Sequence, residues 1–482
     1  MEKFKEFKLS ENINKAINKL GFVEPTAVQQ KVIPILSESE DIIVQAQTGS
    51  GKTLSYGIPL CMDMVWEQNE ASALILVPTR ELANQVRKDI DAIATYERFR
   101  LVSVYGHASY DAQRQQLKGK VHGVIGTPGR VLDHIIQGTF NLDNIRYVVL
   151  DEADEMLDMG FIEQVEEILS YIKTEHTTAL FSATMPEKIK ALALTFLDHP
   201  KTLSIRDENK VESRIKIDSY EVEEEDKLDI LYKVLLSEKP DSAIIFAKTQ
   251  DRVDQVFNFL NRNGMCVGIL HGGMDQKSRT ASIERFKAGK KRILVATDVA
   301  ARGLDVDDVT HIINYDLPNV VENYIHRMGR SARKDTYGKL ISLIGYGDRD
   351  ERYKIEESTG IPFEFKDTAT IRIKDEEAAL ETLSKIFALR NDKTDLVKKD
   401  VTTLYVNAGK IKKMRAKDIV GAIMDCPNIA FEDIGIIDIR DNVTYVDIHN
   451  GKGQRVLKYL EKNSIKGKTV RVEIATGSKS QY

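Results

Sequence analysis

One eight-residue stretch near the N-terminus combines the residue types that hold the phosphates of a nucleotide. Gly49 and Gly51 let backbone N–H groups turn toward an anion at a helix N-terminus. Lys52 can reach the outer phosphates as a point charge, and Thr53 offers a hydroxyl to Mg2+. The sequence therefore predicts an ATP-type phosphate loop, made of Ala46, Gln47, Thr48, Gly49, Ser50, Gly51, Lys52 and Thr53.

The position of this stretch supports that interpretation. It follows the apolar segment 41–45 and precedes a helical pattern over 54–65, so it lies at the strand-to-helix junction that phosphate loops require. Ala46 stands where the generic motif has its first glycine. The alternative is an ordinary glycine-rich turn, which the sequence Gly-Lys-Thr after a strand disfavours.

An acidic run follows a second apolar strand and supplies the groups that phosphate hydrolysis needs. Asp151-Glu152-Ala153-Asp154 comes directly after the segment 147–150. Asp151 can hold Mg2+, and Glu152 can orient and deprotonate the attacking water. Alone, such a run often marks only the N-terminus of a helix, but the upstream phosphate loop favours the catalytic interpretation.

Short apolar strands that alternate with amphipathic helices must position these groups. This rhythm over residues 1–205 predicts a parallel α/β sheet whose polar clusters meet at the carboxyl ends of the strands. The predicted strands cover 42–45, 73–77, 101–105, 121–125, 147–150 and 178–181.

The same rhythm recurs after a polar hinge at 203–212, and it predicts a second α/β domain over 213–365. This domain has no phosphate loop of its own, so it shares the first domain's nucleotide or serves another purpose. Its predicted strands cover 243–246, 267–270, 293–295, 311–314 and 340–343.

Length and charge set the outer limits of the interpretation. At about 150 residues per domain, the 482 residues suggest roughly three domains. The net charge is −5, yet residues 403–482 hold 14 Lys/Arg against 9 Asp/Glu. The basic tail is therefore a candidate for nucleic-acid binding, although a small surplus of charge is more often a solvated face.

No apolar run approaches the ~18 residues of a membrane span, and no hydrophobic signal segment follows Met1. We therefore expect a soluble, cytoplasmic protein without a membrane partner. The three cysteines, Cys61, Cys266 and Cys426, are far apart and are expected to be inert core thiols.

Further motifs, in order along the chain, make the sequence resemble the DEAD-box RNA helicase family over nearly all of residues 4–345. The resemblance implies two RecA-like domains, ATP and Mg2+ as cofactors, and RNA as partner. In that family's Q motif an aromatic ring stacks on adenine and a glutamine reads its edge. The matching residues are Phe4, Gly21, Pro25, Thr26 and Gln29.

Other segments resemble the family's RNA contacts and its coupling motif. Ser182-Ala183-Thr184 resembles the motif that couples hydrolysis to strand separation, and the resemblance gives His326 a coupling role as well. The resemblance implies RNA contacts from both domains, at Pro78, Arg80, Thr127, Gly129, Arg130, Gln276, Arg279 and Thr297.

The second domain also matches the family's contributions to the nucleotide. Asp305 matches the acid that contacts the ribose, and Arg330 and Arg333 in the segment 326–333 match arginine fingers. A finger delivered from a separate domain makes hydrolysis conditional on the two domains meeting. Spacing alone leaves open that Arg327, Arg330 and Arg333 form a solvated basic helix.

Two departures from the family pattern stand out. Gly106-His107 follows the segment 101–105 where the family usually has two glycines, which puts the approach of that loop to RNA in doubt. Ser331-Ala332 replaces the usual Thr-Gly, at a cost if that position needs positive φ.

After a charged, helix-containing linker at 366–402, residues 403–476 show the β-α-β-β-α-β order of an RNA-recognition motif. This predicts a small α+β domain. Tyr405 and Tyr445 would share an exposed face as a reduced stacking platform, or both pack inside. A basic loop suited to phosphates holds Lys410, Lys412, Lys413 and Arg415.

A core of this family with this tail resembles the DbpA/YxiN-like subgroup. That resemblance implies an RNA-dependent ATPase that separates short RNA duplexes, acting as a monomer on a 23S-type ribosomal RNA hairpin in the large-subunit precursor. The alternatives are an ATP-gated RNA clamp, a DNA helicase, or a DEAD-box helicase with another target such as messenger or cold-shock RNA.

Overall fold

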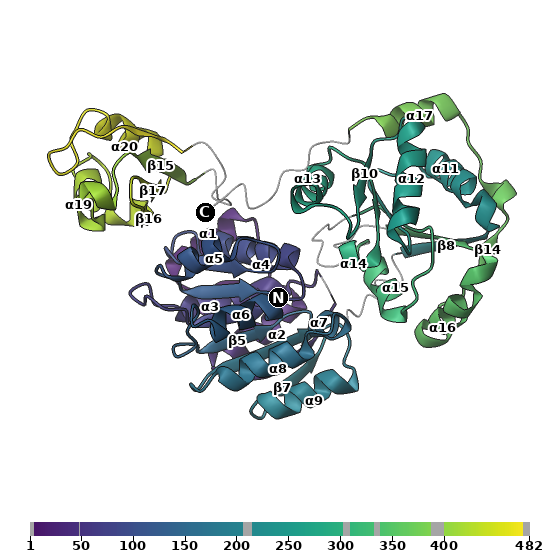
Figure 1. Ribbon diagram of the computed structural model, residues 1–482, viewed down its shortest axis with the longest axis horizontal. Coiled ribbons are helices and arrows are strands. Elements are labelled where there is room, and N and C mark those ends of the chain that lie inside the picture. The colour runs from purple at the N-terminus through teal and green to yellow at the C-terminus, as the bar shows by residue number, and fades with distance from the viewer. Residues whose placement is uncertain are drawn as a thin grey trace. The chain divides into compact units, whose positions relative to one another are not determined.

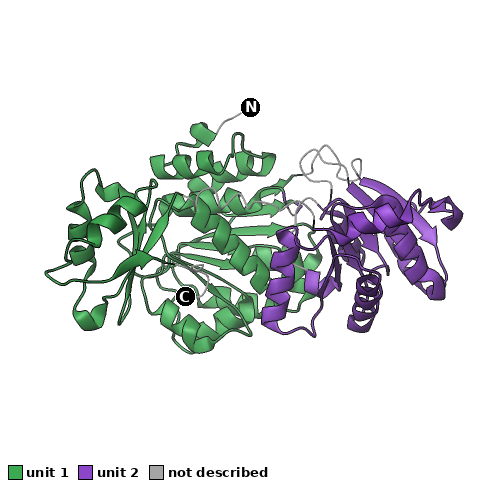
Figure 2. Cartoon of the chain, turned by 90° about the horizontal axis from the view of Figure 1, so that it is seen from above, with its two compact units in different colours: residues 1–46, 50–205, 392–482 green, residues 47–49, 206–391 purple. Residues whose placement is uncertain are grey.

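The computed structural model describes residues 4–47, 49–205, 215–301, 309–331, 338–386 and 400–475. The chain forms two compact units, coloured separately in Figure 2. One unit holds residues 1–46, 50–205 and 392–482, and the other holds 47–49 and 206–391.

The first domain is a seven-stranded parallel sheet of order β3-β4-β2-β5-β6-β1-β7. Its strands are β1 (Ile42–Gln45), β2 (Ala73–Leu76), β3 (Leu101–Val104), β4 (Gly123–Gly126), β5 (Tyr147–Leu150), β6 (Thr177–Ser182) and β7 (Lys201–Ser204). Its helices are η1 (Phe4–Phe7), α1 (Glu11–Lys19), α2 (Ala27–Ser37), α3 (Lys52–Asp63), α4 (Arg80–Ile93), α5 (Tyr110–Leu117), α6 (Pro128–Ile136), α7 (Ala153–Asp158), α8 (Ile162–Tyr171) and α9 (Glu187–Phe196).

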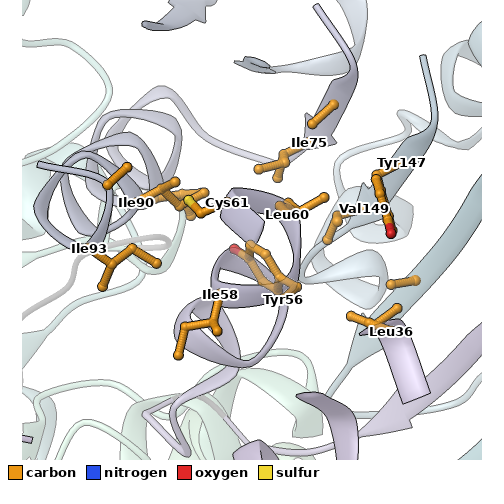
Figure 3. Close-up of a cluster of buried hydrophobic side chains, with 14 of the residues drawn as sticks. Leu36, Tyr56, Ile58, Leu60, Cys61, Ile75, Ile90, Ile93, Tyr147 and Val149 are labelled. Atoms are coloured by element: carbon orange, nitrogen blue, oxygen red, sulfur yellow. The ribbon is translucent and has the colours of Figure 1, made fainter. Parts of the chain in front are cut away.

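Helices cover both faces of this sheet, which explains why its strands are almost wholly apolar. In β5, Tyr147 and Val149 face the layer of α1 to α4, while Val148 and Leu150 face α6, α8 and α9. Figure 3 shows the first of these layers, where Tyr56 of α3 lies among buried aliphatic side chains. The buried layers hold the carboxyl ends of the strands, and the loops that follow them, in a fixed arrangement.

The second domain repeats this architecture with a parallel sheet of order β10-β11-β9-β12-β13-β8-β14. Its strands are β8 (Ile215–Glu221), β9 (Ala243–Phe246), β10 (Val267–Leu270), β11 (Ile293–Ala296), β12 (His311–Asn314), β13 (Gly338–Ile344) and β14 (Phe365–Lys366). Its helices are η2 (Glu224–Asp226), α11 (Lys227–Glu238), α12 (Gln250–Arg262), α13 (Gln276–Lys287), α14 (Asp298–Ala301), α15 (Val321–Met328), η3 (Tyr346–Asp348), α16 (Arg349–Thr359), η4 (Thr368–Thr370) and α17 (Glu376–Ser384).

The helix expected in the charged segment 366–402 is α17, and it packs on the second domain. Leu383 is fully buried in the core that α11 and α12 share, and Leu380 packs at its edge. Figure 1 shows α17 beside these two helices. Phe387, four residues after Leu383 in the sequence, lies outside the described residues.

The tail is a four-stranded antiparallel sheet of order β16-β17-β15-β18, with helices that bury one face. The β-α-β-β-α-β order is confirmed. Its elements are β15 (Thr402–Val406), η5 (Lys410–Lys412), α19 (Ala416–Met424), η6 (Phe431–Asp433), β16 (Ile434–Ile439), β17 (Thr444–Ile448), α20 (Gly453–Leu460) and β18 (Val472–Ile474).

The predicted fold, two RecA-like parallel-sheet domains followed by a small α+β domain, is confirmed. β7, β8 and β14 were not predicted, because they lie at or next to a sheet edge and carry polar residues. Within the described parts of the chain, no helix has the length and apolar character needed to cross a membrane.

Candidate ATP and RNA sites

The predicted phosphate loop connects β1 to α3. Gly49 and Gly51 have φ of 78° and 91°, a conformation that favours glycine. A Cβ on Gly51 would also lie 2.6 Å from Gln29 Nε2, so the position leaves no room for a side chain. Gly51 is the N-cap of α3 and has no capping side chain, which leaves first-turn N–H groups available to an anion. Thr48 lies outside the described residues.

The Q-motif residues Thr26 and Gln29 hold this loop in place. Thr26 Oγ1 donates a hydrogen bond to Ser50 O at 2.8 Å, and Gln29 Nε2 donates to Gly51 O at 3.2 Å. Gln29 Oε1 accepts from Thr26 N, which closes a capping box at the start of α2. Phe4 is buried in η1 and meets Phe7 edge to face.

Lys52 and Asp151 lie together in the interior at the end of the sheet. The Lys52 ammonium is 3.7 Å from Asp151 Oδ1, and both side chains are buried. Lys52 Nζ finds no hydrogen-bond acceptor within the described residues. A buried ammonium needs more than one distant ion pair, so this group is suited to bind the phosphate oxygens of a nucleotide.

Tyr56 is a site residue that the sequence prediction missed. Its Oη donates to Asp151 Oδ2 at 2.9 Å and also bonds the Thr53 side chain. Burial and the neighbouring carboxylate raise the pKa of Tyr56 well above its usual value, so the ring keeps its proton. The available signal was its spacing, because Tyr56 lies one helical turn after Lys52 and Thr53 and shares their face of α3.

Glu152 occupies the sharp turn between β5 and α7. Its φ of 55° and ψ of 53° place it in the left-handed region, and its side chain is buried. Such a conformation costs on the order of 1–3 kcal/mol in a residue other than glycine, and it persists where the surrounding structure holds it. Here the backbone N–H of Glu152 donates to Asp151 Oδ1 at 3.0 Å, which orients the Asp151 carboxylate against this turn.

Asp154 joins the acidic run to the predicted coupling motif. Its Oδ2 accepts hydrogen bonds from Ala183 N at 3.1 Å, Thr184 N at 2.8 Å and Thr184 Oγ1 at 3.0 Å. Ser182 Oγ accepts from Asp154 N at 3.2 Å. These bonds tie the acidic run to the backbone of residues 183 and 184. The sequence placed Asp154 in the motif but assigned it no role.

The RNA-contact residues predicted in the first domain follow the carboxyl ends of two neighbouring strands, β2 and β4. Arg80 begins α4 after β2, and Thr127 precedes α6 after β4, which is the neighbouring strand. Pro78 lies in the loop before α4, and Gly129 lies in the first turn of α6. Arg130 donates from Nη1 to Ala108 O at 3.1 Å and to Gln113 Oε1 at 3.0 Å.

At the departure Gly106-His107, a residue other than glycine has a positive φ. His107 adopts φ of 59°, a left-handed conformation that histidine tolerates better than most side chains do. Gly106 has no atom near the position of an added Cβ.

Arg327 and Arg330 of the second domain differ in their surroundings. Arg327 is 2% exposed and bonds both oxygens of Asp298 at 2.6 Å. It also donates to Asn314 Oδ1 and lies over the ring of Phe246. These contacts give Arg327 a structural role. Arg330, three residues later, is also buried.

The remaining second-domain predictions fall on separate elements. Gln276 lies in the first turn of α13, and Arg279 donates to Ala300 O at 2.8 Å. Thr297 follows β11, and His326 lies in the last turn of α15. The buried Ser331 Oγ donates to Val309 O at 2.6 Å. Asp305, Ala332 and Arg333 lie outside the described residues.

The two tail tyrosines lie opposite each other across β15 and β17. Their ring centroids are 5.7 Å apart with an edge-to-face geometry, and both rings are partly exposed. The sheet register adds Asp438 beside Tyr445 and Glu473 beside Tyr405. The two tyrosines therefore share one face of the sheet, and acids flank them on both sides.

The basic loop of the tail has a second half that the sequence prediction missed. Lys466 Nζ donates to Lys413 O at 3.0 Å, and Lys468 Nζ donates to Lys412 O at 2.8 Å. These contacts join two loops about fifty residues apart into one surface, which we call the two-loop basic surface. Its members are Lys410, Lys412, Lys413, Arg415, Lys466 and Lys468.

Three family descriptions match the chain in the order of its domains. "DEAD/DEAH box helicase" matches residues 26–192, and "Helicase conserved C-terminal domain" matches residues 226–335. "DbpA RNA binding domain" matches residues 403–474. The three matches fall within the two parallel-sheet domains and the small antiparallel-sheet domain, in that order.

Individual relatives agree with these matches. ATP-dependent RNA helicase DbpA of Bacillus subtilis is 45% identical over 98% of this chain and 100% of the relative. DEAD-box ATP-dependent RNA helicase CshA of Geobacillus kaustophilus is 41% identical over 74% of this chain and 77% of the relative.

Among solved structures, S. cerevisiae Dbp5 bound to RNA and ADP BeF3 is similar with a TM-score of 0.71 and 26% identity. The similarity covers 80% of this chain and 100% of that one. The geometry of the site agrees with the three family matches. Lys52 is buried beside Asp151, and Asp154 is hydrogen-bonded to Thr184, as a nucleotide site joined to a coupling motif requires. The chain belongs to the DEAD-box ATP-dependent RNA helicases and carries a DbpA RNA-binding domain.

Proposed function

We propose that this chain is an RNA-dependent ATPase that separates short duplexes of large-subunit ribosomal RNA during ribosome assembly, as a cytoplasmic monomer. The observation that carries the proposal is the pairing of a buried, acceptor-poor Lys52 with an acidic run that Asp154 joins to residues 182–184. The relative named DbpA and the DbpA domain favour ribosomal RNA as the target, in line with the subgroup that the chain resembles.

For the nucleotide, the proposal assigns the phosphates to the loop at 46–53 and to Lys52. Thr53 and Asp151 would hold Mg2+, because a hydroxyl and a carboxylate oxygen are the ligands this ion prefers. Bound Mg2+ would neutralise charge on the phosphates and help to stabilise the charge that develops there. Tyr56 keeps one oxygen of Asp151 engaged, which leaves Oδ1 directed toward the Lys52 side.

On the adenine side, the proposal assigns Phe4, Thr26 and Gln29 to the base and Asp305 to the ribose. Gln29 already uses one N–H and one lone pair on the loop and on Thr26. An amide group has a second N–H and a second lone pair, which are the groups a purine edge requires. Loop position and base recognition would then depend on the same side chain.

For hydrolysis, Glu152 would accept the proton of the attacking water while its strained turn keeps it beside Asp151. Arg330 and Arg333 would stabilise the charge on the transferred group once RNA has drawn the second domain onto the first. Arg327 is excluded from that role because Asp298 and Asn314 occupy its guanidinium.

For RNA, the first-domain contacts at 78–80, 106–107 and 127–130 and the second-domain contacts at Gln276, Arg279 and Thr297 would bind the backbone. Backbone contacts position a nucleic acid but carry no sequence information. Selectivity would come from the tail, through Tyr405, Tyr445 and the two-loop basic surface. Single-stranded loops of a hairpin can stack on such rings while lysines contact the phosphates.

The test compares ATPase activity of the full chain and of a chain without residues 403–482 against intact and fragmented ribosomal RNAs. The proposal predicts that truncation keeps RNA stimulation but removes the preference for one ribosomal fragment. Equal discrimination by both proteins would contradict the role of the tail. A strand-displacement assay on a short duplex completes the test, because ATPase activity without displacement would indicate an ATP-gated clamp.

A further inference from the structure

The buried residue of α5 is a glutamine. α5 is capped by Ser109, and Gln113 is the residue of this helix whose side chain is buried, at 5% exposure. A buried amide lowers stability unless its N–H and C=O groups find partners. The partners of Gln113 therefore indicate what the position is for.

Gln113 uses both ends of its amide on groups outside its own helix. Its Nε2 donates to Tyr105 O at 3.0 Å, directly before the loop at 106–109. Its Oε1 accepts from Arg130 Nη1 at 3.0 Å and faces His134 Nε2 at 3.2 Å. The reverse amide orientation would place its NH2 group against the Arg130 guanidinium, which has only donors, so the orientation is fixed.

The same contacts hold the loop at 106–109 from both sides. Gln113 binds the carbonyl of Tyr105 before the loop, and Arg130 binds the carbonyl of Ala108 within it at 3.1 Å. Tyr105 Oη also accepts from Asn84 of α4 at 3.2 Å, so the helix that begins at Arg80 joins the network. This bracing explains how the left-handed His107 is maintained where the family has a glycine.

His134 completes the environment of the Gln113 oxygen. It is fully buried, stacks on Tyr110 with centroids 4.3 Å apart, and has Thr139 Oγ1 2.8 Å from Nδ1. Burial and the nearby Arg130 lower the pKa of His134 to about 4, so the ring is neutral at pH 7. Because Gln113 Oε1 can only accept, a neutral ring with its proton on Nε2 donates to it.

We propose that Gln113 is a positioning residue for RNA. Its side chain holds both Arg130 and the loop at 106–109, so that the two together form a single surface for the RNA backbone. The inference rests on the proposed RNA contact of Arg130. It goes further in assigning the geometry of that contact to a residue that does not reach the RNA. Loss of Gln113 should therefore weaken RNA binding without changing the nucleotide site.

The test uses the full chain with a Gln113→Leu substitution, and Gln115→Leu as the matched control. Gln115 is exposed on the same helix, so the control makes the same chemical change outside the network. Binding of a labelled single-stranded oligouridylate is titrated in the presence of a non-hydrolysable ATP analogue. Gln113→Leu should raise the Kd on the order of tenfold, as expected when buried donors lose their acceptor, while Gln115→Leu leaves it unchanged.

Two further readouts separate positioning from loss of folding. The stoichiometry and affinity of ATP-analogue binding should match the unmodified chain, because the phosphate loop is on other elements. The ATPase rate at saturating RNA should also stay the same, since only the RNA concentration for half-maximal stimulation moves. His134→Phe, which keeps the stacked ring but loses both ring hydrogen bonds, should give a smaller shift in the same direction.

A double-substitution cycle with Arg130→Ala gives the decisive comparison. If Gln113 acts through Arg130, the combined loss of RNA affinity is less than the product of the two single losses. If the loss of RNA affinity in the double variant equals the product of the two single losses, Gln113 does not act through Arg130, and the positioning role is wrong. Unchanged affinity in Arg130→Ala would contradict the proposed RNA contact itself, whereas a loss there with none in Gln113→Leu would contradict only this inference.

Discussion

The phosphate site of the first domain and the two-loop basic surface of the tail are built in opposite ways. In the phosphate site, Lys52 and Asp151 are buried, and Thr26, Gln29 and Tyr56 tie the loop and the acid in place. The lysines of the tail surface are exposed, and Lys466 and Lys468 bond through Nζ to backbone carbonyls of the facing loop.

This difference predicts different responses to substitution. A buried charged group interacts strongly because little water screens it, and its partners cannot rearrange freely when one is removed. Exposed cations interact through screened charge, so each contributes a small, salt-dependent share of RNA affinity. Single changes should therefore abolish a function at the first site and only scale it at the second.

The largest effect is expected from Arg330→Ala. If Arg330 is an arginine finger, RNA-stimulated ATP hydrolysis should fall by about 10^3 or more. Nucleotide binding should survive, because the phosphate loop is on the first domain. Steady-state ATPase rates and ATP-analogue titrations measure the two quantities, and a wild-type rate would remove Arg330 from the mechanism.

Arg327→Ala is the matched comparison for this variant. Removing Arg327 leaves the Asp298 carboxylate without its bidentate partner, a change that typically destabilises by about 3 kcal/mol or more. We expect a lower free energy of unfolding of the second domain in urea for Arg327→Ala than for the unmodified chain, while the folded variant keeps more RNA-stimulated hydrolysis than Arg330→Ala does. A loss of hydrolysis in folded Arg327→Ala as large as in Arg330→Ala would contradict the division between a structural and a catalytic arginine.

Glu152→Gln comes next and tests the buried site from the first-domain side. The amide keeps the size and hydrogen bonding of the side chain but cannot accept the proton, so hydrolysis should fall about 10^2-fold or more. ATP and RNA binding should stay close to normal. Glu163→Gln, on the exposed side of α8, is the control for the charge change. Turnover at the normal rate in Glu152→Gln would show that another group is the base.

The sequence predicted those parts of the site whose residues follow one another along the chain. Three parts of the site are each a short continuous segment at the end of a strand: the phosphate loop, the acidic run and residues 182–184. Residues that are close in such a segment are also close in the fold, so the sequence alone brings them together. Tyr56, Gln113 and the lysine pair at 466 and 468 were missed for the opposite reason. Each acts on a group in a distant segment, through a contact that only the folded chain creates.

The same distinction explains which secondary-structure elements could be predicted from the sequence. Strands buried on both faces are continuous apolar runs, and their positions were predicted closely. The edge strands β7 and β14 consist mainly of exposed residues and include polar ones, so no apolar run marked them. For α17, periodicity predicted a helix, but its packing against α11 depends on a partner surface more than a hundred residues earlier.

Tyr56→Phe should have a smaller effect than the loss of a catalytic group. The ring stays in its buried layer while Asp151 Oδ2 loses a hydrogen bond of 2.9 Å. Loss of a group that orients a metal ligand typically costs about tenfold or more in metal affinity. The Mg2+ concentration for half-maximal binding of a fluorescent ATP analogue should rise by about that factor, and Tyr171→Phe on the exposed face of α8 should not change it. An unchanged Mg2+ requirement would show that Asp151 is oriented without Tyr56.

The smallest effect is expected from replacing Lys466 and Lys468 together by alanine. The variant should bind a ribosomal RNA hairpin more weakly, mainly at low salt, while the ATPase response to unstructured RNA stays the same. If each lysine contacts one phosphate, the slope of log affinity against log salt should become shallower by about two. The matched control is Arg455→Ala with Lys458→Ala, which removes the same charge from exposed positions of α20.

The salt slope is the informative quantity, because Lys466 and Lys468 also hold the facing loop through Lys413 O and Lys412 O. A loss of affinity with an unchanged slope would mean that the two residues shape the surface without contacting phosphate. A shallower slope in the α20 control as well would mean that the tail attracts RNA through its overall charge. Only a change of slope confined to Lys466 and Lys468 supports a defined surface made of two loops. That result would complete the contrast with the phosphate site, where position within the fold, and not the number of charges, decides the effect.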